Sequence, residues 1–243
     1  MIYGLIPCRL DSTRLKQKAL LEIDGLPLII HTLKRAMMAK KLDKVIVCTA
    51  SRKIQEVVKK YGGEVFISKK KHATGTDRIA EFASKLNKKD IIIDIQSDYP
   101  LLRPKDIDVL VDFHKKNNFE IVCPVTKIYD ATSPNIVKVV KNKLGRILYF
   151  SRAAVPYEFK EKNNSFFYHM SIISFNQLSL LKFSKFKKGK IEKVEGIELM
   201  RALENDITIG TFEISGESFS VDVKKDYLKA ISLMPSDPIR KMY

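Results

Sequence analysis

Strand-like and helix-like segments alternate from residue 2 to residue 116 of this 243-residue chain. The run 90–95 (DIIIDI) is almost continuously apolar, as expected of a strand that is buried on both faces of a parallel sheet. Because this alternation is typical of βαβ units, we predict an α/β fold whose mostly parallel sheet has helices on both faces. The expected strands are 2–6, 44–49, 64–67 and 90–95, and the expected helices are 27–38, a segment capped by Ser51, 76–86 and 104–116.

The pattern changes at about residue 119, where short strand-like runs become more frequent. We expect one domain, residues 1–243, with an inserted, partly antiparallel lobe at about residues 120–190. An isolated lobe of this size has too few residues to bury the apolar runs 121–125 and 166–175. We therefore predict that a second copy of the chain buries them in a two-fold symmetric homodimer. The expected strands are 121–125, 136–141, 146–151, 166–175, 207–213 and 218–221, with a hairpin turn at 142–145 and helices at 177–183, 192–205 and 224–233.

The formal net charge of +16 raises the question of nucleic-acid binding. Most of the excess is scattered lysine without a helix-turn-helix, an RNP-type sheet or a zinc finger, so we expect anionic small substrates and no nucleic acid. No apolar run approaches the roughly 20 residues that span a bilayer, and no signal-peptide pattern precedes the first strand. The cysteines, Cys8, Cys48 and Cys123, are far apart, which favours buried free thiols and a cytoplasmic location.

The loop after the first strand carries three cations and two hydroxyls at the carboxyl edge of the sheet. These residues are Arg9, Ser12, Thr13, Arg14 and Lys18. Ligands bind at this edge in open α/β sheets, and both guanidinium and ammonium groups match phosphate oxygens. The loop therefore predicts a polyphosphate site, with a solvated basic loop as the alternative. It has no GxxxxGK[ST] pattern, which argues against a P-loop NTPase.

Two aspartates that follow strand-like runs are candidates for binding magnesium. Asp98 comes after the run 90–95, and Asp222 comes after the run 218–221. Carboxylates that converge at one sheet edge can hold one or two Mg²⁺ ions together with substrate phosphates. The alternative for each is a turn or helix N-cap aspartate.

The segment 72–78 (HATGTDR) lies between a strand and a helix. We expect Thr76 or Asp77 to cap the helix. Spacing alone does not show whether Thr74 and Arg78 bind a ligand.

The second half of the chain contributes two further cations, Lys138 and Arg152, as candidates for binding a substrate carboxylate. The alternative for both is a surface charge. No Ser/His/Asp or Cys/His order indicates covalent catalysis.

Taken together, these segments resemble the 3-deoxy-manno-octulosonate cytidylyltransferases, or CMP-Kdo synthetases, over nearly the whole chain. No single block decides this, but their common order and spacing are very specific. IPxRxxSTR with a following lysine is residues 6–14 and Lys18, GGEV is 62–65, H-x-[ST]-G-T-[DE]-R-x-A-E is 72–81, PNxVKVV is 134–140, YFSR is 149–152, and GVDTxEDL is degraded to 220–223 with Asp226.

The resemblance implies a Rossmann-like nucleotide-diphospho-sugar transferase fold and the reaction CTP + Kdo → CMP-Kdo + diphosphate, a step of lipopolysaccharide biosynthesis. It also implies a Mg²⁺ cofactor and a homodimer whose lobe contributes to the sugar pocket. Arg9, Arg14 and Lys18 would hold the triphosphate, Thr74 and Arg78 the nucleotide, Asp98 and Asp222 the metal, and Gln96, Arg152, His169 and Glu198 the sugar.

Several positions depart from the family pattern where the sugar should lie. QGDEP is QSDYP at 96–100, HxGIY is HMSII at 169–173, and LEQLR is IELMR at 197–201. A serine for glycine narrows a pocket, and a tyrosine for an acid replaces a charge by an aromatic wall. Two alternatives follow: a cytidylyltransferase for another acidic sugar, such as amino-Kdo or a nonulosonic acid, and a catalytically weakened nucleotide-binding paralogue. The altered positions are Ser97, Tyr99, Ser171, Ile173 and Leu199, while the loop 16–19 lacks PGKP and Ala50 replaces an aspartate.

Overall fold

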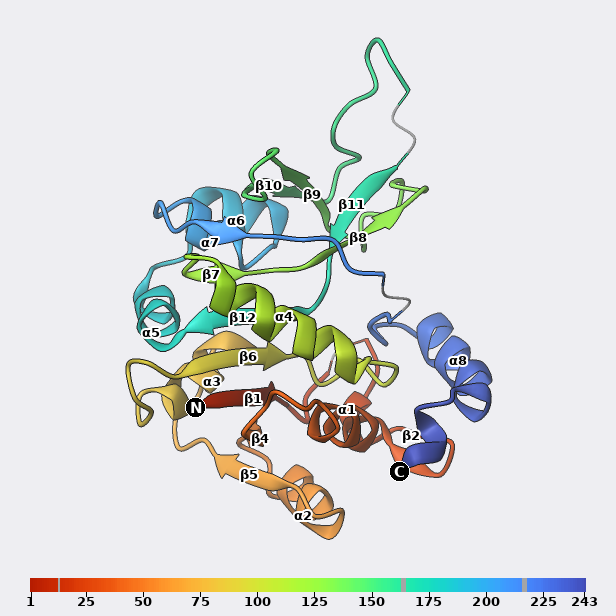
Figure 1. Cartoon of the computed structure of the whole chain (residues 1–243). Coiled ribbons are helices and arrows are strands. Elements are labelled where there is room, and N and C mark those ends of the chain that lie inside the picture. Colours follow the sequence, from red (N-terminus) through yellow and green to blue (C-terminus); the bar gives the residue numbers. More distant parts are fainter. Residues whose placement is uncertain (13, 163–164, 216–217) are drawn as a thin grey trace.

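The computed structural model describes residues 1–12, 14–162, 165–215 and 218–243. In this part of the chain the central sheet has seven strands in the order β13-β7-β12-β6-β1-β4-β5 (Figure 1). Only β12 runs antiparallel to its neighbours β6 and β7, so the sheet is mostly parallel, as predicted. The strands are β1 Ile2–Pro7, β4 Lys44–Thr49, β5 Glu64–Ile67, β6 Ile91–Ile95, β7 Ile121–Val122, β12 Ile172–Asn176 and β13 Ile209–Gly210, and a small separate hairpin pairs β2 Glu22–Ile23 with β3 Leu26–Pro27.

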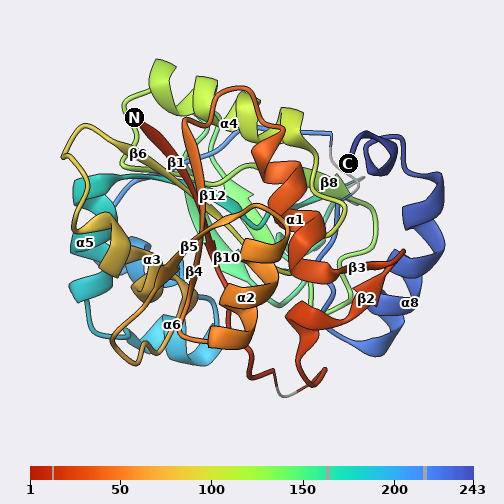
Figure 2. The same cartoon turned by 90° about the horizontal axis from the view of Figure 1, so that it is seen from below.

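Helices cover both faces of the central sheet (Figure 2). Successive side chains of β1 point to opposite faces, so Leu5 packs with the α3 and α5 side while Ile6 packs with α1, α2 and α4. No described helix is long and apolar enough to cross a membrane. The helices are α1 Leu28–Met37, α2 Arg52–Lys60, α3 Gly75–Ala83, α4 Pro104–Lys116, α5 Gln177–Lys185, α6 Lys190–Glu195, α7 Met200–Leu203 and α8 Lys224–Leu233.

The position of β1 between β4 and β6 determines where a ligand can bind. After β1 the chain passes through α1 to β4 on one side, and it later returns to β6 on the other side. Such a change of direction leaves a crevice at the carboxyl ends of the two strands. The loops that follow Pro7 and Ile95 carry the predicted phosphate and metal residues, so the topology brings them to one edge.

A second sheet of four antiparallel strands, in the order β10-β9-β11-β8, lies within residues 125–169. The strands are β8 Val125–Ile128, β9 Lys138–Lys141, β10 Ile147–Ser151 and β11 Phe166–His169. The expected hairpin turn at 142–145 is present, with the Asn142 N–H donating to the Arg146 carbonyl at 2.9 Å and Gly145 at a φ of 72°. The flanking strands β7 and β12 belong to the central sheet, so the antiparallel part is shorter than residues 120–190.

The apolar runs that suggested an exposed lobe are buried within the chain. Ile121, Val125 and Phe175 are 0% exposed, and Phe166 is 9% exposed. The packing of the two sheets and their helices covers these side chains, so the argument for a homodimer from these runs was wrong. The homodimer itself stays a prediction.

Several predicted elements of the second half differ from the structure. The expected strand 166–175 is divided between β11 of the antiparallel sheet and β12 of the central sheet. The expected helix 192–205 is divided into α6 and α7, because Gly196 takes a φ of 63° and ends α6. The expected strand 207–213 is reduced to Ile209–Gly210. The run 218–221 is not a strand, because the Val221 N–H bonds to the Asp98 carbonyl in a loop instead of to a neighbouring strand.

Candidate active site

A cavity of about 290 Å³ opens at the carboxyl ends of β1 and β6, and we call it the phosphate-side cavity. It gathers side chains from positions 9 to 222 of the sequence, as the topology predicts. The predicted residues that line it are Arg9, Arg14, Lys18, Thr74, Arg78, Gln96, Asp98 and Asp222. Ser12 lines it as well, whereas Thr13 lies outside the described residues.

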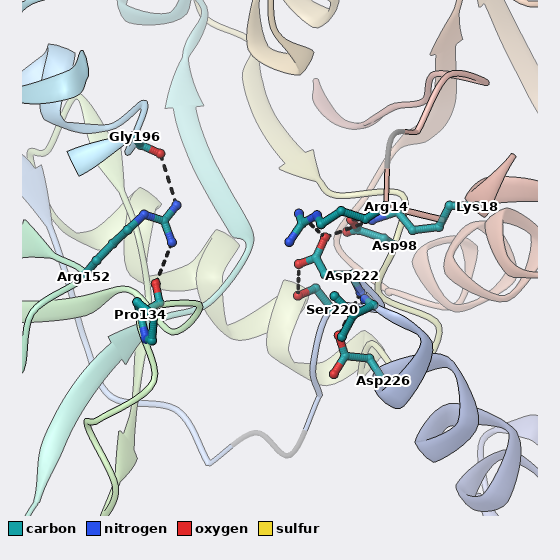
Figure 3. A network of polar contacts seen from close by, with 10 residues as sticks. Arg14, Lys18, Asp98, Pro134, Arg152, Gly196, Ser220, Asp222 and Asp226 are labelled. Atoms are coloured by element: carbon teal, nitrogen blue, oxygen red, sulfur yellow. Dashed lines mark hydrogen bonds and ion pairs between the residues drawn. The ribbon is translucent and has the colours of Figure 1, made fainter. Parts of the chain in front are cut away.

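Lys18 joins the two predicted metal ligands (Figure 3). Its ammonium group donates to Oδ2 of Asp98 at 2.6 Å and to Oδ1 of Asp222 at 3.1 Å. Arg14 donates to the same oxygen of Asp222 at 3.0 Å. The two carboxylates converge, and two cations neutralise them.

The protonation of this cluster follows from burial and charge. Burial opposes the charge of Lys18, but Asp98 and Asp222 outweigh it and raise the pKa of the lysine. Burial raises the pKa of Asp98, and Lys18 opposes that shift. Burial also acts to raise the pKa of Asp222, but the charge and hydrogen bond of Lys18 outweigh burial, so the pKa of Asp222 is lowered. Lys18 therefore remains a cation near neutral pH, which makes it a strong donor to phosphate.

Asp222 is held in place by backbone hydrogen bonds instead of by a strand. The Val221 N–H donates to the Asp98 carbonyl at 2.9 Å, which fixes the two aspartates side by side. Asp226, in the first turn of α8, accepts the N–H groups of Asp222 and Val223, each at 3.0 Å. The Ser220 hydroxyl donates to the other carboxylate oxygen of Asp222 at 2.9 Å. Short-range capping therefore orients the carboxylate of Asp222.

The segment 72–81 closes the other side of the phosphate-side cavity. Thr74, not Thr76 or Asp77, caps α3: its hydroxyl accepts the Asp77 N–H at 3.1 Å, because α3 begins one residue earlier than expected, at Gly75. Arg78 donates to the Cys8 carbonyl at 3.1 Å and so ties α3 to the end of β1.

A hydrogen bond between His72 and Glu81 secures the same segment. Nε2 of His72 lies 2.6 Å from Oε2 of Glu81, and the same oxygen accepts the Ser68 hydroxyl. Burial opposes ionisation of Glu81, but these two partners lower its pKa to about 2.

A second cavity of about 230 Å³ adjoins the first and shares Gln96 with it. We call it the sugar-side cavity, and the other predicted sugar residues, Arg152, His169 and Glu198, line it. Burial lowers the pKa of His169 to about 4, so its imidazole is neutral near pH 7. The sequence analysis missed Asp94, a buried acid of β6 that also lines this cavity. The only signal for it is an acid within the apolar run 90–95.

Arg152 and Lys138 differ in their access to a ligand. Arg152 lines the sugar-side cavity, and backbone carbonyls, including those of Pro134 and Gly196, hold its guanidinium (Figure 3). Lys138 is 0% exposed, and its ammonium donates to three backbone carbonyls at 2.6–2.8 Å. Its donors are used to hold the loop before β9, so the expectation that Lys138 grips a substrate carboxylate was wrong.

The five altered positions all lie at cavities, but they act differently. Ser171, Ile173 and Leu199 line the sugar-side cavity, and Ser97 lines the phosphate-side cavity. Tyr99 is only 5% exposed, and its hydroxyl donates to Oγ of Ser171 at 2.8 Å. Tyr99 does not line the sugar-side cavity, but it lines a third cavity together with Ser171, Arg152 and His169. Its hydrogen bond fixes Ser171, which lines both cavities.

The donor set at Asp98 and Asp222 fits magnesium. Carboxylate oxygens are hard ligands, and two of them converge where the cations of the phosphate-side cavity also lie. The described residues contain no cluster of three or more metal-binding side chains. A magnesium ion held here would complete its coordination with phosphate oxygens and water, as is usual for this ion.

Comparison with known proteins agrees with this geometry. A profile of the cytidylyltransferase family matches residues 3–209. The 3-deoxy-manno-octulosonate cytidylyltransferase of Thermodesulfovibrio yellowstonii is 36% identical over 91% of this chain and 93% of its own length. That of Rickettsia canadensis is 38% identical over 93% of each chain. This chain belongs to the 3-deoxy-manno-octulosonate cytidylyltransferase family.

A solved structure supports the same assignment. It is that of a CMP:2-keto-3-deoxy-manno-octonic acid synthetase in complex with CTP, with a TM-score of 0.92 and 30% identity over 97% of this chain and 98% of that chain. The expected fold, the nucleotidyltransferase class and the resemblance are thus confirmed.

Proposed function

We propose that this cytidylyltransferase activates Kdo or a closely related 2-keto-3-deoxy sugar acid, producing the CMP-sugar and diphosphate. The observation that carries the proposal is the cluster of Lys18, Arg14, Asp98 and Asp222 at the carboxyl ends of β1 and β6. The two relatives described above are 3-deoxy-manno-octulosonate cytidylyltransferases, which supports the choice of sugar class.

In this proposal the two cavities hold the two substrates. The triphosphate of CTP lies in the phosphate-side cavity, where Lys18, Arg14 and Arg9 offer charged donors. The sugar lies in the sugar-side cavity against Gln96, Arg152, His169 and Glu198. Its anomeric hydroxyl attacks the α-phosphorus of CTP and forms a new P–O bond. The bond from the α-phosphorus to the oxygen bridging to the β-phosphorus breaks, diphosphate leaves, and the hydroxyl proton passes to solvent.

The residues contribute mainly position and charge, as is usual in phosphoryl-group chemistry. Lys18 and Arg14 exchange their aspartate partners for phosphate oxygens, and Asp98 and Asp222 hold Mg²⁺. The ion would neutralise charge on the triphosphate. Gln96, which lines both cavities, is placed to keep the sugar beside the α-phosphate.

We also propose a cytoplasmic homodimer. The described cysteines Cys8, Cys48 and Cys123 are free and buried, which suits a reducing compartment. Exposed aromatic side chains beyond the antiparallel sheet support self-association: Tyr129 and Tyr157 are 83% exposed and Phe159 is 82% exposed.

The test is diphosphate release from CTP and Mg²⁺ in the presence of Kdo, of other 2-keto sugar acids, and of no sugar. We expect release that requires both a sugar acid and CTP, with ATP a poor replacement and UTP tolerated at most weakly. Sugar-independent release, or equal use of ATP, would contradict the proposal.

A further inference from the structure

The sugar-side cavity contains two carboxyl groups with unsatisfied oxygens. Asp94, in β6, is 1% exposed, and its Oδ1 accepts a hydrogen bond from Nε2 of Gln96 at 2.9 Å. Its Oδ2 has no hydrogen-bond partner among the described residues. Oε1 of Glu198 also lacks a hydrogen bond, and Arg201 lies 3.7 Å from it. Buried polar atoms are normally hydrogen-bonded, so unpaired acceptors that line a cavity indicate a ligand with donors.

Burial disfavours the ionised form of both carboxyl groups, and the charge of Glu198 adds to this effect at Asp94. Burial and then the charge of Glu198 raise the pKa of Asp94 well above its usual range, and burial raises the pKa of Glu198. A positive charge on a ligand would oppose both shifts and restore the ionised forms. An ammonium group supplies that charge together with three N–H donors and no acceptor.

The remaining wall of the sugar-side cavity offers few free donors. Backbone carbonyls engage three of the five N–H donors of Arg152, which leaves two of them for a ligand. His169 is neutral near pH 7 because burial lowers its pKa to about 4. Ile173 and Leu199 are apolar. The acceptor-rich end of the cavity therefore lies at Asp94 and Glu198, and Arg152 is the cation of this wall.

We propose that the sugar-side cavity selects a keto-acid sugar in which one hydroxyl is replaced by a primary amine, whose ammonium group pairs with Asp94 and Glu198. The inference rests on the proposed function and narrows its substrate class to zwitterionic amino sugar acids. Arg152, the cation of the same cavity, suits the substrate's carboxylate, and the carboxyl pair suits the ammonium group. The two charges of the substrate thus match two separate parts of one cavity.

The test compares kcat/KM for Kdo with that for a set of Kdo analogues, each with a single hydroxyl replaced by an amine. We expect the wild-type enzyme to favour one amine analogue over Kdo by at least about tenfold, because charge-assisted hydrogen bonds are roughly twice as strong as neutral ones. Asp94→Asn and Glu198→Gln keep the shape of the side chains but remove the charge. Each should lower the amine-to-Kdo ratio by about tenfold, whatever its effect on kcat/KM for Kdo itself.

The ratio between two substrates is measured within one variant, so partial misfolding does not alter it. Asp112→Asn, a surface carboxylate on α4 that pairs with Lys41, is the matched control and should leave the ratio unchanged. A wild-type enzyme that uses Kdo at least as well as every amine analogue, or an unchanged ratio in both carboxamide variants, would overturn the inference and leave the proposed function standing. Failure to transfer to any sugar acid would overturn both.

Discussion

At the scale of single residues, the phosphate-side cavity consists of opposite charges that already satisfy one another. Lys18 contacts both aspartates, and Arg14 contacts one of them. A triphosphate with a metal ion presents the same two kinds of partner, negative oxygens for the cations and a positive ion for the carboxylates. In the proposed function, substrate binding would therefore be an exchange of partners, which costs less than exposing unpaired charges.

Removing a cation should weaken nucleotide binding. Lys18→Ala and Arg14→Ala should each reduce CTP affinity by roughly 1.5–3 kcal/mol, the usual value of a charge-assisted hydrogen bond. Calorimetry with CTP and Mg²⁺ measures this directly. Lys16→Ala, an exposed lysine of the same loop that does not line the phosphate-side cavity, should bind CTP like the wild type. Equal losses in all three variants would indicate a general charge effect instead of specific contacts.

Removing a carboxylate should affect turnover more than binding. Asp98→Asn and Asp222→Asn should lower kcat by about a hundredfold or more, because charge stabilisation of this kind is a large part of catalysis. Affinity for CTP without Mg²⁺ should be kept or increased, since Lys18 is then freed from a partner. Steady-state kinetics across a Mg²⁺ titration, with circular dichroism as a check of folding, provides the measurement. Full activity in either variant contradicts the metal role.

Glu81 should make the stability of the protein depend on pH. Its pKa is about 2 in the folded chain, below its ordinary value, so its stabilising contribution is present above roughly pH 5 and is lost as the pH falls toward 2. We expect Glu81→Gln to destabilise the protein by roughly 1–2 kcal/mol at pH 7 and by much less at pH 3. Urea unfolding at both values tests this, and an equal difference at the two would show that the carboxylate charge is not involved.

At the scale of elements, periodicity predicted the first half of the fold well and the second half less well. The bounds of β4, β5 and α4 agree with the sequence analysis because each is a clear apolar run or amphipathic repeat between turn residues. The conformation of Gly196, and the loop that places Val221 against Asp98, depend on tertiary contacts that no local pattern reveals.

The same limit applies to the prediction of the site from the sequence. Positively charged loops are visible in the sequence, whereas Asp94 is visible only as one acid in a buried strand.

The first turn of α8 should link helix capping to catalysis. Asp226→Ala removes the acceptor for the N–H groups of Asp222 and Val223, which should cost about 1 kcal/mol of stability and also displace Asp222. Ser51→Ala is the matched control because it also removes a helix cap, that of α2. This helix does not line the phosphate-side cavity and lies on the opposite side of the sheet from α3, which does. Both variants should unfold at lower urea concentrations, but only Asp226→Ala should reduce kcat. Unchanged kcat in Asp226→Ala would show that the cap does not position the metal ligand.

At the scale of the whole molecule, the distribution of apolar side chains suggests where a second copy would bind. The described core is well covered on both faces of the central sheet. Residues 152–162, which follow β10, project from the antiparallel sheet in Figure 1 and include Tyr157 and Phe159, which are 83% and 82% exposed. A monomer gains nothing from exposing two large aromatic rings, whereas a two-fold contact could bury both pairs.

The homodimer should therefore depend on this projecting segment. Light scattering at micromolar concentration should give twice the chain mass of 27.9 kDa for the wild type. The double variant Tyr157→Ser with Phe159→Ser should shift toward the monomer, because burial of an aromatic side chain contributes about 1.5–3 kcal/mol and each acts twice across a symmetric interface. Leu228→Ser, an exposed side chain on α8, serves as the control and should remain dimeric. A wild-type monomer would contradict the dimer itself, and a dimeric double variant would place its interface elsewhere on the molecule.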